Sequence, residues 1–331
     1  MTDVQTAPAP GSAKPKRRIN LGFDKYSGLY VWAVLIIIFS LWIPDLFLQV
    51  STLKQVLIFQ AIAAIVALGL IIPVAAGAFD LTVAGTLTVS VCFTAWALLN
   101  HRGVVFAAGG ALLIGIIVGL ANAFVVVKLK VDSFIGTLGM SSILIAVAYM
   151  ITDSSQIVLS TEGYAPFFEF AREEILGLPR SVYYAAAIAA LFWWILEYTP
   201  GGRYLYAVGG NPVASRLAGV RVGRIITLSF VASAVTSAFA GIVYLSTIGT
   251  ATPDSGSGYL LPAFSAVFLG ATQIRPGRVN VLGTLVAIFL LATGVTGLQL
   301  AGAPSYVTEL FNGAALIIAV ALAARTARRR A

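Results

Sequence analysis

Few residues in this chain could take part in covalent or metal chemistry. A single cysteine, Cys92, excludes an intrachain disulfide, and it cannot build a Cys/His metal cluster with the single histidine, His101. No serine has a plausible partner base, and the phosphate-binding pattern GxxxxGK[ST] does not occur. We interpret Cys92 as a packing residue and His101 as a solvated loop residue. We expect no catalysis, and no metal or cofactor bound by this chain.

Polar side chains within long apolar stretches offer a different chemistry, namely hydrogen bonding to a polar solute. Such groups are costly in a membrane, so they usually face protein or a water-filled path. An uncharged polyol or sugar requires neutral hydrogen-bonding partners and few fixed charges. The candidate path residues are Gln60, Asp80, Asn122, Thr296, Gln299 and Asn312.

Each of these residues has an alternative role. The neutral side chains can equally form hydrogen bonds between helices. Asp80 is the one acid near the second and third apolar runs. It either shapes the path or places its charge at the N-terminus of the third helix, where the helix dipole favours an anion. The helix cap is the interpretation we favour for Asp80.

The composition places these residues in a membrane protein. Of the 331 residues, 59% are hydrophobic and 10% are charged, whereas soluble domains carry roughly 25% charged residues. A bilayer is the natural solvent for such a chain. The net charge of +8 does not indicate nucleic acid, because the basic residues lie at the chain ends and in short loops. We expect membrane lipid as the surrounding partner.

Apolar runs recur along the sequence with polar breaks between them. Most approach the ~20 residues that a spanning helix requires, although the sixth and eighth are short. The fold class we predict is an all-α integral membrane protein of about ten transmembrane helices. The predicted runs are 29–48, 55–78, 81–99, 103–127, 133–151, 182–197, 225–249, 259–273, 279–299 and 305–324.

The basic residues orient these helices. With both termini in the cytoplasm and ten alternating helices, four of the 21 basic residues fall outside and the other 17 inside. The predicted organisation is a disordered basic cytoplasmic tail (1–28), a transmembrane domain (29–324) and a basic cytoplasmic tail (325–331). We interpret the first apolar run as a retained helix and not as a cleaved signal. The four outside residues are Lys54, Arg102, Arg172 and Arg180.

Two loops are long. The outer one, at 152–181, contains FFEFAREEIL, which predicts an amphipathic helix at the interface. In the inner one, at 198–224, we expect turns at Pro200–Gly202 and at Gly209–Gly210. Asn211 as N-cap and Pro212 as first residue then predict a short helix to Ala218, closed by Gly219. An ordinary capped connector is the alternative interpretation of this segment.

The inner loop resembles that of ribose-type ABC importer permeases, whose common pattern runs GxxxxAxGxNxxAAxxxGI. Three further segments resemble the same family in the same order: 77–90, 267–287 and 312–322. The departures are Phe79, Ala84, Ser215, Val220, Ala271 and the Arg275–Pro276 pair. The residues that match the inner-loop pattern are Gly202, Ala207, Gly209, Asn211, Ala214 and Gly219.

The resemblance implies a permease subunit of the bacterial cytoplasmic (inner) membrane that imports a sugar or similar small solute. It implies a second permease chain, identical or paralogous, an extracytoplasmic solute-binding protein, and ABC ATPase subunits that bind ATP and Mg. In the family, the inner loop forms the coupling helix, here between helices 6 and 7. The implied coupling residues are Gly209, Gly210, Asn211, Pro212, Ala214, Ser215, Arg216, Ala218, Gly219 and Val220.

Other classes of membrane protein fit less well. An ion-coupled secondary transporter is the main alternative, but the helix interiors are almost free of the ionisable residues that proton coupling uses. Sodium coupling through backbone carbonyls stays open. A membrane enzyme would need a polar cluster at one depth, and a channel would need a filter motif or a charged ring; we find neither.

Overall fold

Helices form nearly the whole of the structure, as the apolar runs predict. The computed structural model describes the backbone of residues 23–328 and the side chains of residues 26–322. The predicted tail at 1–28 therefore lies mostly outside the described residues, as do the side chains of the predicted tail at 325–331. The helices are α1 (Phe23–Trp42), α2 (Pro44–Phe47), α3 (Val50–Ala75), α4 (Thr82–Leu99), α5 (Val104–Ala123), the π-helical turn η1 (Phe124–Lys128), α6 (Ser133–Thr152), α7 (Ala165–Arg172), α8 (Arg180–Tyr198), α9 (Pro200–Gly210), α10 (Pro212–Leu217), α11 (Val222–Ile248), α12 (Ser257–Gly270), α13 (Val281–Leu300) and α14 (Tyr306–Arg328).

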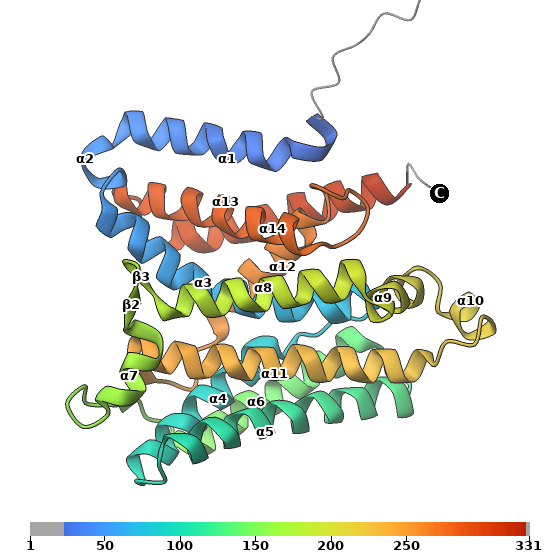
Figure 1. Ribbon diagram of the computed structural model, residues 1–331, viewed down its shortest axis with the longest axis horizontal. Coiled ribbons are helices and arrows are strands. Elements are labelled where there is room, and N and C mark those ends of the chain that lie inside the picture. Colours follow the sequence, from blue (N-terminus) through green and yellow to red (C-terminus); the bar gives the residue numbers. More distant parts are fainter. Residues whose placement is uncertain (1–22, 329–331) are drawn as a thin grey trace, which may run out of the picture.

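Seven of these helices are long and apolar enough to cross a membrane: α3, α4, α5 with η1, α6, α8, α11 and α13. Shorter apolar helices at Tyr26–Trp42, Ser257–Gly270 and Tyr306–Leu322 occupy the other three predicted runs. The helices lie side by side as a bundle with their axes in roughly the same direction (Figure 1). The structure thus supports seven crossings on length and composition.

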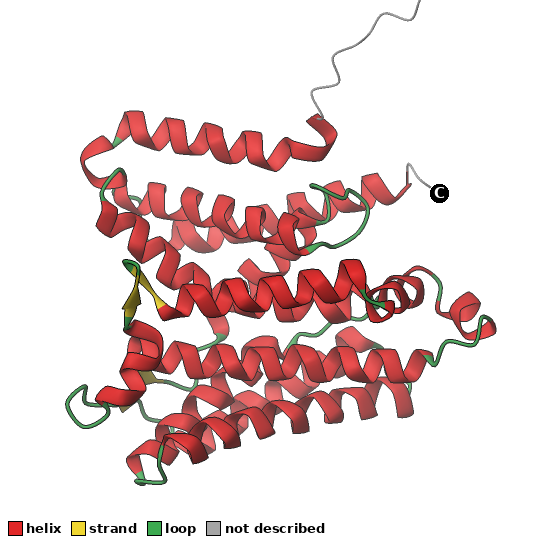
Figure 2. Cartoon of the chain, in the orientation of Figure 1, coloured by secondary structure: helices red, strands yellow, loops and turns green. Residues whose placement is uncertain are grey.

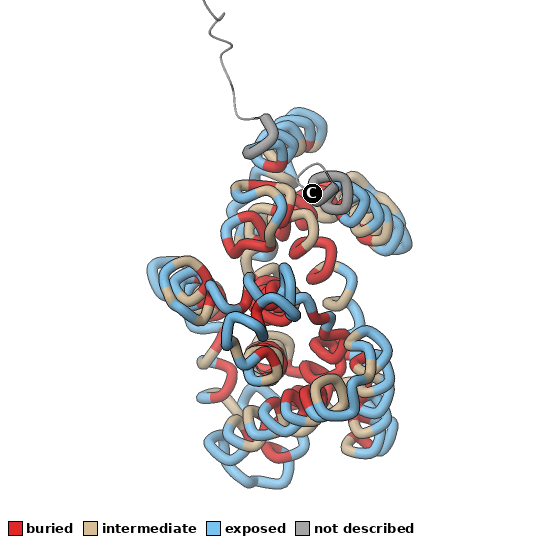
Figure 3. The backbone as a smooth tube through the Cα atoms, turned by 90° about the vertical axis from the view of Figure 1, so that its right-hand side faces the viewer, coloured by how far each residue is buried: buried red, intermediate tan, exposed pale blue. Residues whose placement is uncertain are grey.

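The centre of the bundle is α3, α4 and α11, each of which has more buried residues than any other helix. Figure 3 shows buried residues gathered in the middle of the bundle and exposed residues on the outer faces of the surrounding helices. Gly115 and Gly119 of α5 lie directly against α11: a Cβ at Gly119 would be 2.5 Å from the Cα of Val231. This small-xxx-small pair lets two helix backbones approach closely, as is usual inside membranes.

Two short antiparallel strand pairings complete the fold (Figure 2). Strand β1 (Ile157–Val158) pairs antiparallel with β4 (Thr250–Ala251), and β2 (Glu174–Ile175) pairs antiparallel with β3 (Leu178–Pro179). They flank α7, the amphipathic helix predicted within FFEFAREEIL, whose Phe167, Phe168 and Ala171 are buried. The prediction of a helix in the outer loop is therefore confirmed for the FFEFAR part, whereas the following Glu174 and Ile175 form β2.

The two ends of the bundle differ. α7 and the β2–β3 pair lie at one end, and α9 and α10 lie at the other, which is also where α1 begins and α14 ends (Figure 1). Lys54, Arg172 and Arg180 belong to the first end, where Lys54 pairs with Glu174 and Arg180 with Glu173. Cys92 is buried and His101 is exposed in the turn between α4 and α5, as expected from the sequence.

Candidate functional site

The segment from Thr199 to Gly219 forms two short helices at one end of the bundle. The predicted short helix is present as α10, with Pro212 as its first residue. The side-chain oxygen of Asn211 accepts a hydrogen bond from the Ala214 N–H at 2.9 Å, which is the expected N-cap. Gly219 closes the helix in a left-handed conformation with φ of +83°.

The turns predicted on either side of Tyr206 were wrong, because both segments belong to the helix α9. Pro200 is the first residue of α9, following an N-cap at Thr199, and Gly209 and Gly210 are its last two residues. Gly209 packs so closely against α3 that no side chain fits: a Cβ at this position would lie 2.2 Å from the backbone oxygen of Ala75. A single residue, Asn211, separates α9 from α10.

The surface of α10 is almost entirely exposed. Ser215 is the one buried side chain of this helix, while Arg216 and Ala218 are exposed. Two large apolar side chains are exposed one turn apart: Val213 by 66% and Leu217 by 86%. The sequence interpretation missed them, although their spacing of four residues within PVASRL was a readable signal.

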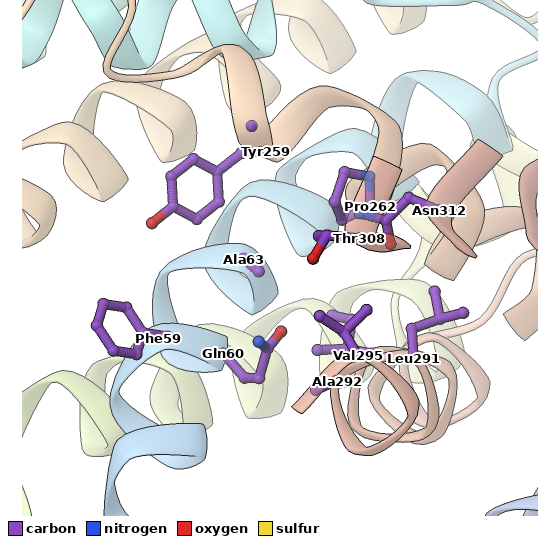
Figure 4. A pocket seen from close by; sticks show the side chains of 12 residues that line it. Phe59, Gln60, Ala63, Tyr259, Pro262, Leu291, Ala292, Val295, Thr308 and Asn312 are labelled. Carbon is purple, nitrogen blue, oxygen red and sulfur yellow. The ribbon is translucent and has the colours of Figure 1, made fainter. Parts of the chain in front are cut away.

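A cavity of about 310 Å³ lies between α3, α12, α13 and α14. It brings together two predicted path residues that are far apart in the sequence, Gln60 and Asn312. In Figure 4 the side chains of Gln60 and Thr308 point toward each other from opposite walls of this space. The lining consists of neutral residues: Phe59, Gln60, Ala63, Gly258, Tyr259, Pro262, Ile288, Leu291, Ala292, Val295, Thr308 and Asn312.

Two other predicted path residues lie close to this cavity without lining it. Gln299 donates a hydrogen bond from Nε2 to Oγ1 of the lining residue Thr308 at 2.9 Å. Thr296 lines a second, mostly apolar cavity of about 450 Å³. In that cavity the indole N–H of Trp32 donates to Thr293 Oγ1 at 2.9 Å, which joins α1 to α13.

Asp80 and Asn122 belong to a separate, fully buried network. Oδ1 of Asp80 accepts hydrogen bonds from the backbone N–H and the hydroxyl of Thr82, at 3.0 and 2.5 Å. The amide of Asn122 donates to the same hydroxyl at 2.8 Å. Asp80 is therefore hydrogen-bonded to the first residue of α4, although the N-cap position of that helix is occupied by Leu81, and the network joins α4 to α5. Neither Asp80 nor Asn122 lines the cavity between α3 and α14.

The chain matches one protein family, and several known proteins, over most of its length. The family described as "Branched-chain amino acid transport system / permease component" matches residues 52–320. The chain is 31% identical over 288 residues to the ribose import permease protein RbsC of Escherichia coli, covering 87% of this chain and 89% of that protein. It is 31% identical over 330 residues to the L-arabinose transport system permease protein AraH of the same organism, covering 97% and 96%.

A third relative is named for the import of autoinducer 2. The autoinducer 2 import system permease protein LsrD of Photorhabdus laumondii is 31% identical over 262 residues, covering 77% of this chain and 78% of that protein. No solved structure matches this chain. The family match at residues 52–320 spans the cavity, α9 and α10 alike.

Proposed function

Because this chain belongs to the family of permease components of branched-chain amino acid transport systems, we propose that it is the membrane-spanning subunit of an ATP-driven importer of a sugar or similar small polar solute. The observation that carries this proposal is the identity of 30–31% to ribose and arabinose permeases over most of both chains. The chain is a protein of the bacterial inner membrane, as its family and its seven apolar helices together indicate.

The chemistry of the cavity supports a sugar over an amino acid. A zwitterionic amino acid would need a partner for each of its two charges, because an unpaired charge in a membrane interior is costly. The lining offers the Gln60 and Asn312 amides and the hydroxyls of Tyr259 and Thr308, and no charged side chain. Neutral donors and acceptors beside aromatic rings suit an uncharged polyhydroxyl solute.

The exposed surface of α10 supports coupling to a separate ATPase subunit. Val213 and Leu217 present an apolar pair on the side of a helix, at the end of the bundle that we assign to the cytoplasm. Apolar residues at this spacing are the anchors by which one helix docks into a groove of another protein. ATP and Mg would bind to that partner, since this chain has no phosphate-binding loop.

The remaining parts of the importer follow from this arrangement. Ten crossings, with both termini in the cytoplasm, would place α7 and the β2–β3 pair outside, where a solute-binding protein delivers the solute. A second permease chain, identical or paralogous, would pair with this one around a central path that includes the Gln60–Asn312 cavity. Movement of α10 on ATP binding would tilt the helices and open the path to alternate sides.

Purification of the chain from its native membrane and reconstitution in liposomes test this function. We expect an ATPase subunit with a phosphate-binding loop to co-purify, and we expect uptake of labelled ribose or arabinose only with binding protein and ATP. Uptake by the chain alone, driven by an ion gradient and without ATP, would instead establish a secondary transporter.

The replacement Gln60→Leu tests the cavity as part of the path. It removes one amide from the lining while keeping the volume, so we expect the maximal uptake rate to fall about tenfold, corresponding to the ~1–1.5 kcal/mol of one hydrogen bond. Gln55→Leu is the matched control, because Gln55 lies on α3 as well but does not line this cavity. Equal rates in the two variants would remove Gln60 from the path.

A further inference from the structure

The loop between α12 and α13 is held as a compact, rigid unit. The Nδ2 of Asn280 donates to the carbonyl oxygens of Gly270 and Gln273, at 3.0 and 3.1 Å, and its Oδ1 caps α13 through Gly283 N–H at 2.8 Å. Gly270 and Gly283 touch: a Cβ at Gly283 would lie 2.3 Å from the Gly270 oxygen. Because of these contacts, a force on the loop moves α12 and α13 together.

A nearly buried carboxylate joins this loop to the end of α8. Glu197 is 8% exposed at its side chain, and both of its oxygens accept hydrogen bonds from Nη2 of Arg278, at 3.0 and 2.8 Å. Arg275 also pairs with Glu197. Two arginines, both more exposed than the carboxylate itself, therefore compensate the charge of Glu197 and tie the loop to the end of α8.

The same arginine contacts α9, which leads to α10. The guanidinium of Arg278 lies 4.4 Å from the centroid of the Tyr206 ring, a cation–π distance. The Tyr206 hydroxyl donates to the carbonyl oxygen of Val279 at 2.9 Å. Burial raises the pKa of Tyr206 to about 12, so this hydroxyl keeps its proton at neutral pH.

These contacts form an unbroken path from the exposed short helix to the cavity. α10 is joined to α9 through Asn211, and α9 contacts the loop through Tyr206 and Arg278. The loop fixes α12 and α13, which supply seven of the residues that line the cavity, among them Tyr259 and Leu291.

We propose that the cluster of Glu197, Arg278 and Tyr206 transmits the movement of α9 and α10 to α12 and α13, and so determines how tightly ATP hydrolysis is coupled to solute passage. This inference rests on the proposed function. Arg278 and Tyr206 act in it as positioning residues that need not touch the solute or ATP. The cluster connects one rigid unit, the loop with its two helices, to another, the α9–α10 segment.

The replacement Arg278→Gln in the reconstituted importer tests the proposal. The readout is the number of solute molecules imported per ATP hydrolysed, which a loss of protein alone would not change. We expect this ratio to fall about tenfold, since single residues in a coupling network change coupling by about that factor. Arg278→Lys, which keeps the charge but not the planar two-oxygen contact, should restore the ratio in part.

A control and a second variant keep this test decisive. Arg180→Gln removes an ion pair from the opposite end of the same helix α8, with Glu173, and should leave the ratio unchanged. If Arg278→Gln fails to insert, Tyr206→Phe keeps the ring under the guanidinium, loses the bond to Val279, and should lower the ratio about threefold.

An unchanged ratio in an inserted Arg278→Gln importer, or in Tyr206→Phe where that variant replaces it, would overturn the proposal and leave the importer function intact. Absence of ATP-dependent uptake by the unmodified importer would instead overturn the proposed function.

Discussion

Replacing Leu217 by aspartate will separate the chain from its ATPase partner while leaving it inserted in the membrane. Leu217 is 86% exposed on α10, so the change disturbs no packing within the chain. In a docked complex, the same change buries a carboxylate in an apolar contact. The expected cost is about 2 kcal/mol of binding free energy, roughly a 30-fold loss of affinity.

The measurement is co-purification of the ATPase subunit with the solubilised chain, together with ATP-dependent uptake in liposomes. Val213→Asp should act in the same direction, because Val213 lies one turn away on the same surface. Leu176→Asp is the matched control for ATPase retention: Leu176 is also a highly exposed leucine, at 94%, but it lies in the β2–β3 turn at the opposite end. Retention of the ATPase by both α10 variants would show that α10 is not the docking helix.

The same helix shows what local sequence signals can predict. Asn211, Pro212 and Gly219 are capping residues whose effect depends on their immediate neighbours, so the sequence predicted α10 to within one residue. The third apolar run, which hydropathy predicts at 81–99, forms α4 at Thr82–Leu99. Hydropathy and capping are local properties, and they locate elements well.

The contacts that matter for function are not local. Glu197 and Arg278 are 81 residues apart, and Gln60 and Asn312 come from the third and the last helix. The sequence around any one of these four residues does not indicate which residue it will contact. Asn122 was predicted for the path because of its depth in an apolar run, and the structure shows that its amide donates to Thr82 and so joins α5 to α4. Polar residues within a membrane bundle are shared between paths and packing, and only the three-dimensional arrangement separates them.

The turn predicted at Gly209 and Gly210 was wrong because the role of a glycine also depends on contacts that are distant in the sequence. Gly209 and Gly210 are neighbours of one type, which by local rules predict a turn. The structure gives them different roles. Gly209 lies against α3, where a Cβ would be 2.2 Å from the Ala75 oxygen and 3.0 Å from the Gly77 nitrogen, whereas a Cβ at Gly210 meets nothing within 4 Å. One glycine allows α9 to touch α3, and the other is free to change.

The paired replacements Gly209→Ala and Gly210→Ala should therefore differ sharply. Gly209→Ala forces α9 away from the backbone of α3, at a cost of about 1–3 kcal/mol. Since α9 carries α10, we expect it to lower both the melting temperature and ATP-dependent uptake. Gly210→Ala adds a methyl group in open space within a helix, so stability should stay equal or rise by up to about 1 kcal/mol.

Thermal unfolding and solute uptake, measured for the two purified variants, test this difference. If they behave alike, the close approach of α9 to α3 does not control the position of α10, and the path from α10 into the bundle would have to run through the Tyr206–Arg278 contact alone.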